Sequence, residues 1–139
     1  MNWTLEVVVV PVTDVDRAKA FYADGLGFVV DHDRRVSDTR RIVQLTPPGS
    51  GCSVVIGTGL SRMTPGSLHG LQLVVPDLRA ARAQLVARGV AVGEIQVLGA
   101  GPPRTAKPGD NLNNVGFVFL SDPDGNGWAI QQIDARRGG

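Results

Sequence analysis

The sequence feature that most constrains the fold is an internal repeat, in which the second half of this 139-residue chain matches the first at a shift of 63 positions. Asp14, expected at the start of a helix, falls on Asp77, and strand, cap and helix align without a gap. Any two strand–helix units share some apolar pattern, so the gapless alignment of all three parts is what favours duplication. The matching apolar positions are Val8, Val10, Val12, Val15, Ala18, Ala20 and Tyr22, which fall on Leu71, Leu73, Val75, Leu78, Ala81, Ala83 and Leu85.

Each repeat predicts one helix with recognisable ends. Thr13 with Asp16 indicates a capping box at the start of the first helix, and the glycines at 25 and 27 end it. The second helix is expected over 77–88, with Asp77 as its cap. The repeat then predicts one core in each half, formed in the first by Val8, Val10, Val15, Ala18 and Tyr22 and in the second by Leu71, Leu73, Leu78, Ala81 and Leu85.

The strands complete the same order of elements in both halves. Turn-rich segments separate strands expected at 5–12, 28–33, 40–46, 52–57, 69–75, 90–97, 115–120 and 127–133. The sequence thus predicts an α+β fold with two βαβββ modules. The first module is expected at 1–57, a linker at 58–67 and the second module at 68–139.

The net charge and the cysteine content limit the binding partners and the cellular compartment to be expected. A net charge of +1 gives no sign of a nucleic-acid partner or an anionic membrane surface. Cys52, a small core hydrophobe by default, is the only cysteine, so no intramolecular disulfide forms and a reducing compartment is expected. The short apolar run near the start resembles neither a membrane span nor a signal peptide. We therefore expect a cytoplasmic protein.

Three segments carry a family resemblance. Residues 12–28, V-T-D-V-D-R-A-K-A-F-Y-A-D-G-L-G-F, their counterpart at 74–90, and S-D-P-D-G-N-G-W at 121–128 resemble signatures of the vicinal oxygen chelate superfamily, which includes glyoxalases, bleomycin-resistance proteins and dioxygenases. The resemblance implies that the two modules curl into a half-open barrel around a cavity. It also implies a homodimer, because members of the family often pair modules across subunits.

The resemblance implies a metal site whose ligands this sequence lacks. Metalloenzymes of the family hold a divalent ion with His or Gln and Glu side chains at four positions. Three of these positions carry Val7, Gly70 and Ala129 here, and the fourth falls in 41–68, which contains no Asp, Glu or His. Glu6 and His69 lie one residue away from the expected positions, which on a strand is the opposite face. We therefore expect no metal cofactor, with His69 and Glu6 as ligands only if a bulge restores the register.

A polar pair is expected in the cavity of the second module. With Ala129 facing the cavity, the period of two puts Gly127 and Gln131 on the same face, and Trp128 and Ile130 on the face covered by the helix. By the same rule Gln72 also faces the cavity. The two glutamines either contact a ligand, or hydrogen-bond each other or line a solvent channel.

The segment 99–114 is a long connection of unusual composition. It contains Arg104, Asn113 and Asn114, three further candidates for ligand contact. Long irregular loops in compact domains are often binding lids or are disordered, and both interpretations are open here.

The function predicted from these features is metal-independent binding of a small organic ligand in the cavity, akin to bleomycin-resistance-type proteins. The alternative is a glyoxalase-like lyase or isomerase, or a dioxygenase, with a non-standard site. A metal-dependent site would need His69, Glu6 or His32 as ligands, and a metal-free one would need an acid–base pair that the sequence does not reveal. A regulatory or interaction module is a third possibility.

Overall fold

The computed structural model describes residues 1–134, so the last five residues of the predicted second module lie outside the described part. The chain divides into two compact units. The first comprises Met1–Leu68 together with Asp122–Asn126, and the second comprises His69–Ser121 and the chain from Gly127 onward. Each unit combines one β-sheet with one α-helical segment, as the α+β prediction requires. The exact limits of the predicted modules and linker stay a prediction.

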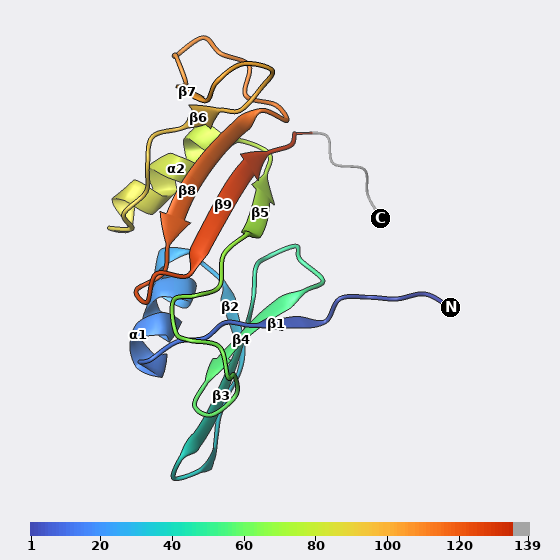
Figure 1. Cartoon of the computed structure of the whole chain (residues 1–139), viewed down its shortest axis with the longest axis vertical. Helices are drawn as coiled ribbons and strands as arrows, with labels where there is room; N and C mark the ends of the chain where they lie inside the picture. Colours follow the sequence, from blue (N-terminus) through green and yellow to red (C-terminus); the bar gives the residue numbers. More distant parts are fainter. Residues whose placement is uncertain (135–139) are drawn as a thin grey trace. The chain divides into compact units, whose positions relative to one another are not determined.

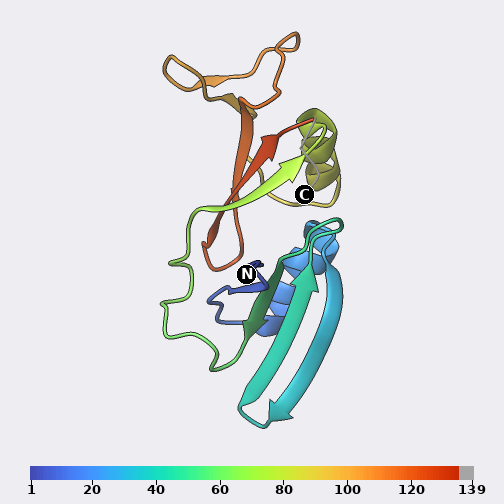
Figure 2. The ribbon, with the colours of Figure 1, turned by 90° about the vertical axis from the view of Figure 1, so that its right-hand side faces the viewer.

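The first unit contains a four-stranded sheet in the order β1-β4-β3-β2. β1 (Val7–Val9) pairs in parallel with β4 (Ser53–Gly57), and β4 is antiparallel to β3 (Arg40–Thr46). β2 (Val29–Ser37) and β3 form the long hairpin seen in Figure 2. α1 (Val15–Ala20) continues into the π-helical turn η1 (Phe21–Gly25), and α1 lies beside β4 (Figure 1).

The predicted first strand is too long. β1 is an edge strand, and its partner β4 begins only at Ser53, whose N–H donates to the Glu6 carbonyl at 2.9 Å. Residues before Glu6 therefore have no strand beside them in this sheet. The side chains of Trp3 and Leu5 are 87% and 69% exposed.

The cap of α1 also differs from the prediction. Asp14, not Thr13, is the N-cap, and its carboxylate accepts from the backbone N–H of Arg17 at 3.0 Å. Thr13 is engaged elsewhere, since its hydroxyl donates to the Asp124 carboxylate at 2.7 Å. The core of this unit lies between α1 and one face of the sheet and includes Val10, Ala18, Tyr22, Val43, Leu45 and Ile56.

The second unit contains a five-stranded sheet in the order β5-β9-β8-β6-β7. β5 (Leu71–Val75) is parallel to β9 (Gly127–Gln132), which is antiparallel to β8 (Gly116–Ser121). β6 (Gln96–Val97) and β7 (Arg104–Thr105) complete one edge. α2 (Leu78–Ala87) contacts β8 and β9 and is visible beside β8 in Figure 1.

α2 begins and ends as predicted. The Asp77 carboxylate accepts from the Ala80 N–H at 3.1 Å, which caps the helix, and Gly89 adopts a φ of 78° after its last turn. Of the predicted core residues here, Leu78 and Leu85 are buried, whereas Leu71, Leu73 and Ala81 are only half-buried. The core is completed by Val118, Leu120, Trp128 and Ile130.

Two connections in the second unit differ from the prediction. The expected strand at 90–97 is a strand only at Gln96–Val97, because the Gly93 carbonyl accepts from the Arg82 side chain at 2.9 Å and holds this segment against α2. The segment 99–114 contains β7, which pairs with β6. No helix within residues 1–134 is long and apolar enough to cross a membrane.

Candidate functional site

One face of the second sheet is buried by α2, and the other is open. Trp128 and Ile130 are 5% and 4% exposed, so they occupy the covered face as predicted. Ala129 therefore lies on the open face, and the strand register places Gln72 beside it on β5 and Phe119 beside it on β8. The open face thus combines residues from the three central strands of the unit.

Phe119 and Ala129 of this face line a hollow of about 400 Å³, together with other residues near the starts of β5 and β9 and the end of β8: His69, Gly70, Leu120, Ser121, Gly127 and Trp128. Three of its lining residues, Gly70, Gly127 and Ala129, have no side chain, or only a methyl group, to fill it. His69 and Phe119 stand beside them. A Cβ atom at Gly127 would come within 2.6 Å of His69 Nδ1, so the glycine is what allows the imidazole to lie there.

Two stacked phenylalanines lie on this face, and Phe119 lines the hollow. The rings of Phe117 and Phe119 are stacked, with centroids 6.2 Å apart and planes at 6°. Phe119 is 47% exposed, although it sits in the middle of a strand. Their alternate positions on β8 were visible in the sequence, but the prediction did not single them out. The register of β8 against β9 is what brings them beside Ala129 and Gln131.

The predicted polar pair does come together on the same face. Gln72 Nε2 donates to Gln131 Oε1 at 2.6 Å, and Gln131 Nε2 donates to the backbone carbonyl of Asn114 at 2.9 Å. Of the alternatives that the sequence left open, the hydrogen bond between the two glutamines is present, and a ligand contact by either of them stays a prediction. Asn114 contributes its backbone oxygen to this chain of amides.

The other two predicted ligand-contacting residues have partners elsewhere. Asn113 Oδ1 accepts from the backbone N–H of Asp134 at 2.8 Å. Arg104 makes two hydrogen bonds to the Asp110 carboxylate, at 2.8 and 3.2 Å. Hydrogen bonds from the Arg104 side chain and, to a smaller extent, from the Lys107 backbone N–H lower the pKa of Asp110 to about 2. A ligand-binding role for Arg104 and Asn113 stays a prediction.

The segment 99–114 is held in place by α2. Arg79 donates to the backbone carbonyls of Lys107 and Asp110, at 2.9 and 3.3 Å. Together with the Arg104–Asp110 ion pair, these contacts give the loop a defined conformation.

The strand registers also locate the fourth metal-ligand position of the family. Gln72 lies opposite Ala129 in the second sheet, and its repeat counterpart Val9 lies opposite Val55 in the first. Val55 is therefore the counterpart of Ala129. Val7, Val55, Gly70 and Ala129 offer no side-chain donor, so the residues present do not fit the family's divalent ion.

The two near misses do not assemble a replacement site. Glu6 and His69 are both exposed. Within residues 1–134, no group of three or more His, Cys, Asp or Glu side chains is arranged to hold a metal. His32 is exposed on β2.

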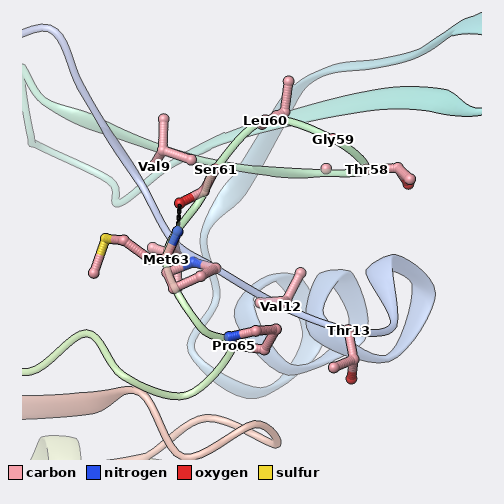
Figure 3. A pocket seen from close by; sticks show the side chains of 12 residues that line it. Val9, Val12, Thr13, Thr58, Gly59, Leu60, Ser61, Met63 and Pro65 are labelled. Atoms are coloured by element: carbon pink, nitrogen blue, oxygen red, sulfur yellow. Dashed lines mark hydrogen bonds between the residues drawn. The ribbon is translucent and has the colours of Figure 1, made fainter.

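A second, smaller hollow of about 170 Å³ lies in the first unit (Figure 3). The side chains of Val9, Leu60 and Met63 contribute to its lining, and Ser61 Oγ accepts from the Met63 N–H at 3.0 Å. No ionisable or aromatic side chain lines it. It offers a ligand fewer directional contacts than the face with the stacked rings. Cys52, half-buried just before β4, does not line either hollow.

A buried polar network in the first unit was not anticipated. The Asp122 carboxylate accepts from the Tyr22 hydroxyl at 2.8 Å and from the Asn126 side chain at 2.8 Å. The backbone N–H groups of Asp124 and Asn126 also donate to it, at 3.0 and 2.9 Å. The predicted strand-joining turn is therefore confirmed as a turn, and its side chains fasten it to α1 and η1.

Comparison with known proteins identifies the family. The sequence model of the Glyoxalase/Bleomycin resistance protein/Dioxygenase superfamily matches residues 4–130, and the chain belongs to this superfamily. No match was found among curated proteins.

Several solved structures are similar over nearly the whole chain. TnmS3, an antibiotic binding protein from Streptomyces sp. CB03234, is 32% identical with a TM-score of 0.72, over 95% of this chain and 97% of that one. A glyoxalase/bleomycin resistance protein from the same strain is 33% identical with a TM-score of 0.68, over 93% and 100%. A superfamily member from Sphaerobacter thermophilus DSM 20745 is 26% identical with a TM-score of 0.69, over 94% and 98%.

Proposed function

We propose that this protein binds a small organic ligand on the open face of its second sheet, without a metal ion. The observation that carries the proposal is the stacked pair Phe117 and Phe119, of which Phe119 lines a hollow together with glycine and alanine. Concave, largely apolar sites with a few polar groups are the usual form of small-molecule sites. The amide groups of Gln72 and Gln131 supply polar groups on the same face.

The energetics favour a flat apolar ligand part at this position. Covering exposed apolar surface contributes about 25 cal/mol per Å², and aromatic pairs add about 0.5–1.5 kcal/mol beyond the buried area. Phe119 has nearly half of its surface available for such contact. A ligand ring over Ala129 would therefore gain both contributions without any charged partner.

The similarity to TnmS3 supports binding rather than catalysis. That protein is described as antibiotic binding, and it aligns with this chain over almost its full length. In this chain the four family ligand positions are Val7, Val55, Gly70 and Ala129, which cannot supply the Lewis acid of the family's metalloenzymes. Binding of a ligand by burial against aromatic rings requires no Lewis acid.

The proposal is tested with a defined aromatic probe, 2-naphthol, in a thermal-shift and fluorescence titration. The wild-type protein should be stabilised at saturating probe, because ligand binding to the native state raises the melting temperature. Phe119→Ala should weaken binding roughly tenfold, whereas Val36→Ala, which truncates another exposed apolar strand residue in the first unit, should leave it unchanged. Equal probe affinity in wild type and Phe119→Ala would contradict the proposal.

A homodimer and a cytoplasmic location remain proposals from the sequence. The homodimer rests on the family's habit of pairing modules across subunits, and the location rests on the single cysteine. Light scattering coupled to size-exclusion chromatography tests the first: a mass of two chains supports the homodimer, and a mass of one chain contradicts it.

A further inference from the structure

We propose that Gln72 makes this site selective for ligands that present an O–H or N–H hydrogen-bond donor at the rim of their ring system. This inference rests on the proposed function, and it names the chemistry of the ligand edge. The basis is the fixed direction of the amide chain from Asn114 through Gln131 to Gln72.

The direction is set by the backbone end of the chain. A carbonyl oxygen only accepts hydrogen bonds, so the Asn114 carbonyl requires the Nε2 end of Gln131. Gln131 must then turn its Oε1 toward Gln72, so Gln72 must donate a hydrogen bond to it from its own Nε2. Neither side-chain amide can rotate by half a turn without placing two oxygens or two nitrogens against each other.

The anchor of this chain is itself held by backbone structure. Asn114 has a φ of 67°, and asparagine tolerates this left-handed conformation better than most residues. Its N–H donates to the Gln132 carbonyl at 2.8 Å, beside Gln131 on β9. The Asn114 carbonyl therefore stays where Gln131 needs an acceptor.

The outer end of the chain is an acceptor on the open face. Gln72 is exposed, and no residue within 1–134 donates a hydrogen bond to its Oε1. A free glutamine could offer either its oxygen or its nitrogen at a given point. Here the bond to Gln131 keeps the oxygen in place, so a ligand approaching that oxygen must bring a donor.

The spacing of the strands places this acceptor within reach of a ligand on the rings. Gln72, Ala129 and Phe119 stand side by side on β5, β9 and β8. Neighbouring strands are about 4.8 Å apart, so a ring system that spans roughly 10 Å reaches from Phe119 to Gln72. Ala129, between them, has only a methyl group and leaves this path open.

A matched pair of probes tests the donor preference. 2-Naphthol and 2-methoxynaphthalene have the same ring system and an oxygen at the same position, but only the naphthol donates. Wild-type protein should bind 2-naphthol about fivefold to tenfold more tightly in fluorescence titrations, the effect of one hydrogen bond. Gln72→Leu should remove this preference and keep the affinity for 2-methoxynaphthalene.

Two further variants separate positioning from general damage. Gln131→Leu leaves Gln72 in place but frees its amide to rotate, so the preference should fall to about twofold or less. Gln44→Leu, on β3 of the first unit, should leave the preference intact. Circular dichroism and melting temperature verify that each variant is folded.

The outcomes distinguish this inference from the proposed function. Equal wild-type affinity for the two probes, with Phe119→Ala weakening both, would overturn the donor preference and leave the binding site in place. A preference that survives in Gln72→Leu would also overturn it. Failure of both probes to bind would contradict the proposed function and, with it, this inference.

Discussion

The two repeats share their helix caps and the parallel pairing of their first and last strands, and they differ in the side chains on their sheets. Asp14 and Asp77 cap their helices with the same extended backbone and the same side-chain bond to the N–H three residues on. In each unit the first strand is parallel to the last strand of the repeat. The repeated sequence therefore specifies the capped helix and the pairing of first and last strands twice. The strands between them differ, because the first sheet has four strands and the second has five.

The sheet faces opposite the helices show the clearest difference, because Ser53 and Val55 of the first sheet are buried whereas Phe119 of the second is exposed. Ser53 and Val55 of the first unit correspond to Gly127 and Ala129 of the second. The Ser53 hydroxyl is hydrogen-bonded to a neighbouring strand, because its Oγ lies 2.6 Å from the Thr46 hydroxyl. The Thr46 hydroxyl in turn donates to the Asp31 carboxylate. In the second unit the smaller residues leave a hollow beside Phe119. The smaller residues at these two positions therefore distinguish the candidate binding face of the second unit from the matching face of the first.

The helix-covered faces differ as well. Tyr22 and Leu85 occupy matching repeat positions and both are buried. Leu85 is purely apolar, whereas the Tyr22 hydroxyl donates to the buried carboxylate of Asp122. The first unit thus depends on a polar network that the second does not have at this position.

The largest effect is expected from removing the centre of that network. Asp122→Ala leaves the donors of Tyr22 and Asn126 without their common acceptor, and should lower the free energy of unfolding by about 3–4 kcal/mol. Urea denaturation measures the change. Asp38→Ala, in the exposed β2–β3 turn, is the control and should change stability by less than about 0.5 kcal/mol. A loss below about 1 kcal/mol in Asp122→Ala would show that the network adds little.

A smaller loss is expected when only the hydroxyl is removed. Tyr22→Phe keeps the ring packed against Phe28 but deletes one hydrogen bond to a carboxylate. The free energy of unfolding should fall by about 1.5–2 kcal/mol, less than in Asp122→Ala, because the other donors to Asp122 remain. An unchanged urea midpoint would show that the Tyr22 hydroxyl does not contribute to stability and that the hydrogen bonds within the turn alone account for the effect of Asp122.

The difference between the two sheets is tested by making the second resemble the first. Ala129→Val introduces the residue found at Val55 and should fill part of the hollow. We expect roughly tenfold weaker binding of 2-naphthol, about 1.4 kcal/mol, with little change in melting temperature. Val55→Ala is the reciprocal variant and should leave probe affinity unchanged. Undiminished binding by Ala129→Val would place the ligand elsewhere.

The smallest effect concerns pH and the β2–β3 hairpin. Hydrogen bonds from Arg41 and then Lys19 hold the pKa of Asp33 well below its usual range. Because the folded-state pKa is lowered, the stabilisation is present above about pH 4, the ordinary aspartate value, and is lost as pH falls toward the lowered pKa. The loss should be below about 1 kcal/mol, since the pair is partly exposed.

Urea midpoints at pH 7 and pH 3 measure this contribution. The difference between the two pH values should shrink in Asp33→Asn, which cannot ionise at this position. An identical pH dependence in the variant and the wild type would assign the effect to other carboxylates.

The sequence predicted what depends on local pattern. The repeat, the Asp77 cap and the alternation of Ala129 with Trp128 and Ile130 all follow from spacing along the chain. The structure confirms the cap and the alternation, and both units keep the repeat's order of strand, helix and further strands. The family resemblance also indicated the α+β fold, because it rests on short motifs that occur in a fixed order along the chain.

The remaining features depend on contacts that no local pattern contains. Tyr22 and Asp122 are one hundred residues apart, and only the folded first unit brings them together. Phe119 acquires its importance from the Ala129 and Gln72 beside it on other strands. The length of the first strand was wrong for a related reason: β1 begins only at Val7, opposite the first residue of its partner β4, although the sequence predicted a strand from residue 5.

The most direct test of the binding face is chemical-shift mapping by nuclear magnetic resonance. The ¹⁵N-labelled protein is titrated with 2-naphthol, and the backbone amides of the two sheets are compared. The proposal predicts the largest shifts at Phe119, Ala129 and Gln72, with Val55 and Gln44 on the first sheet unaffected. Shifts concentrated in β3 and β4, or around the hollow of Val9 and Met63, would contradict it.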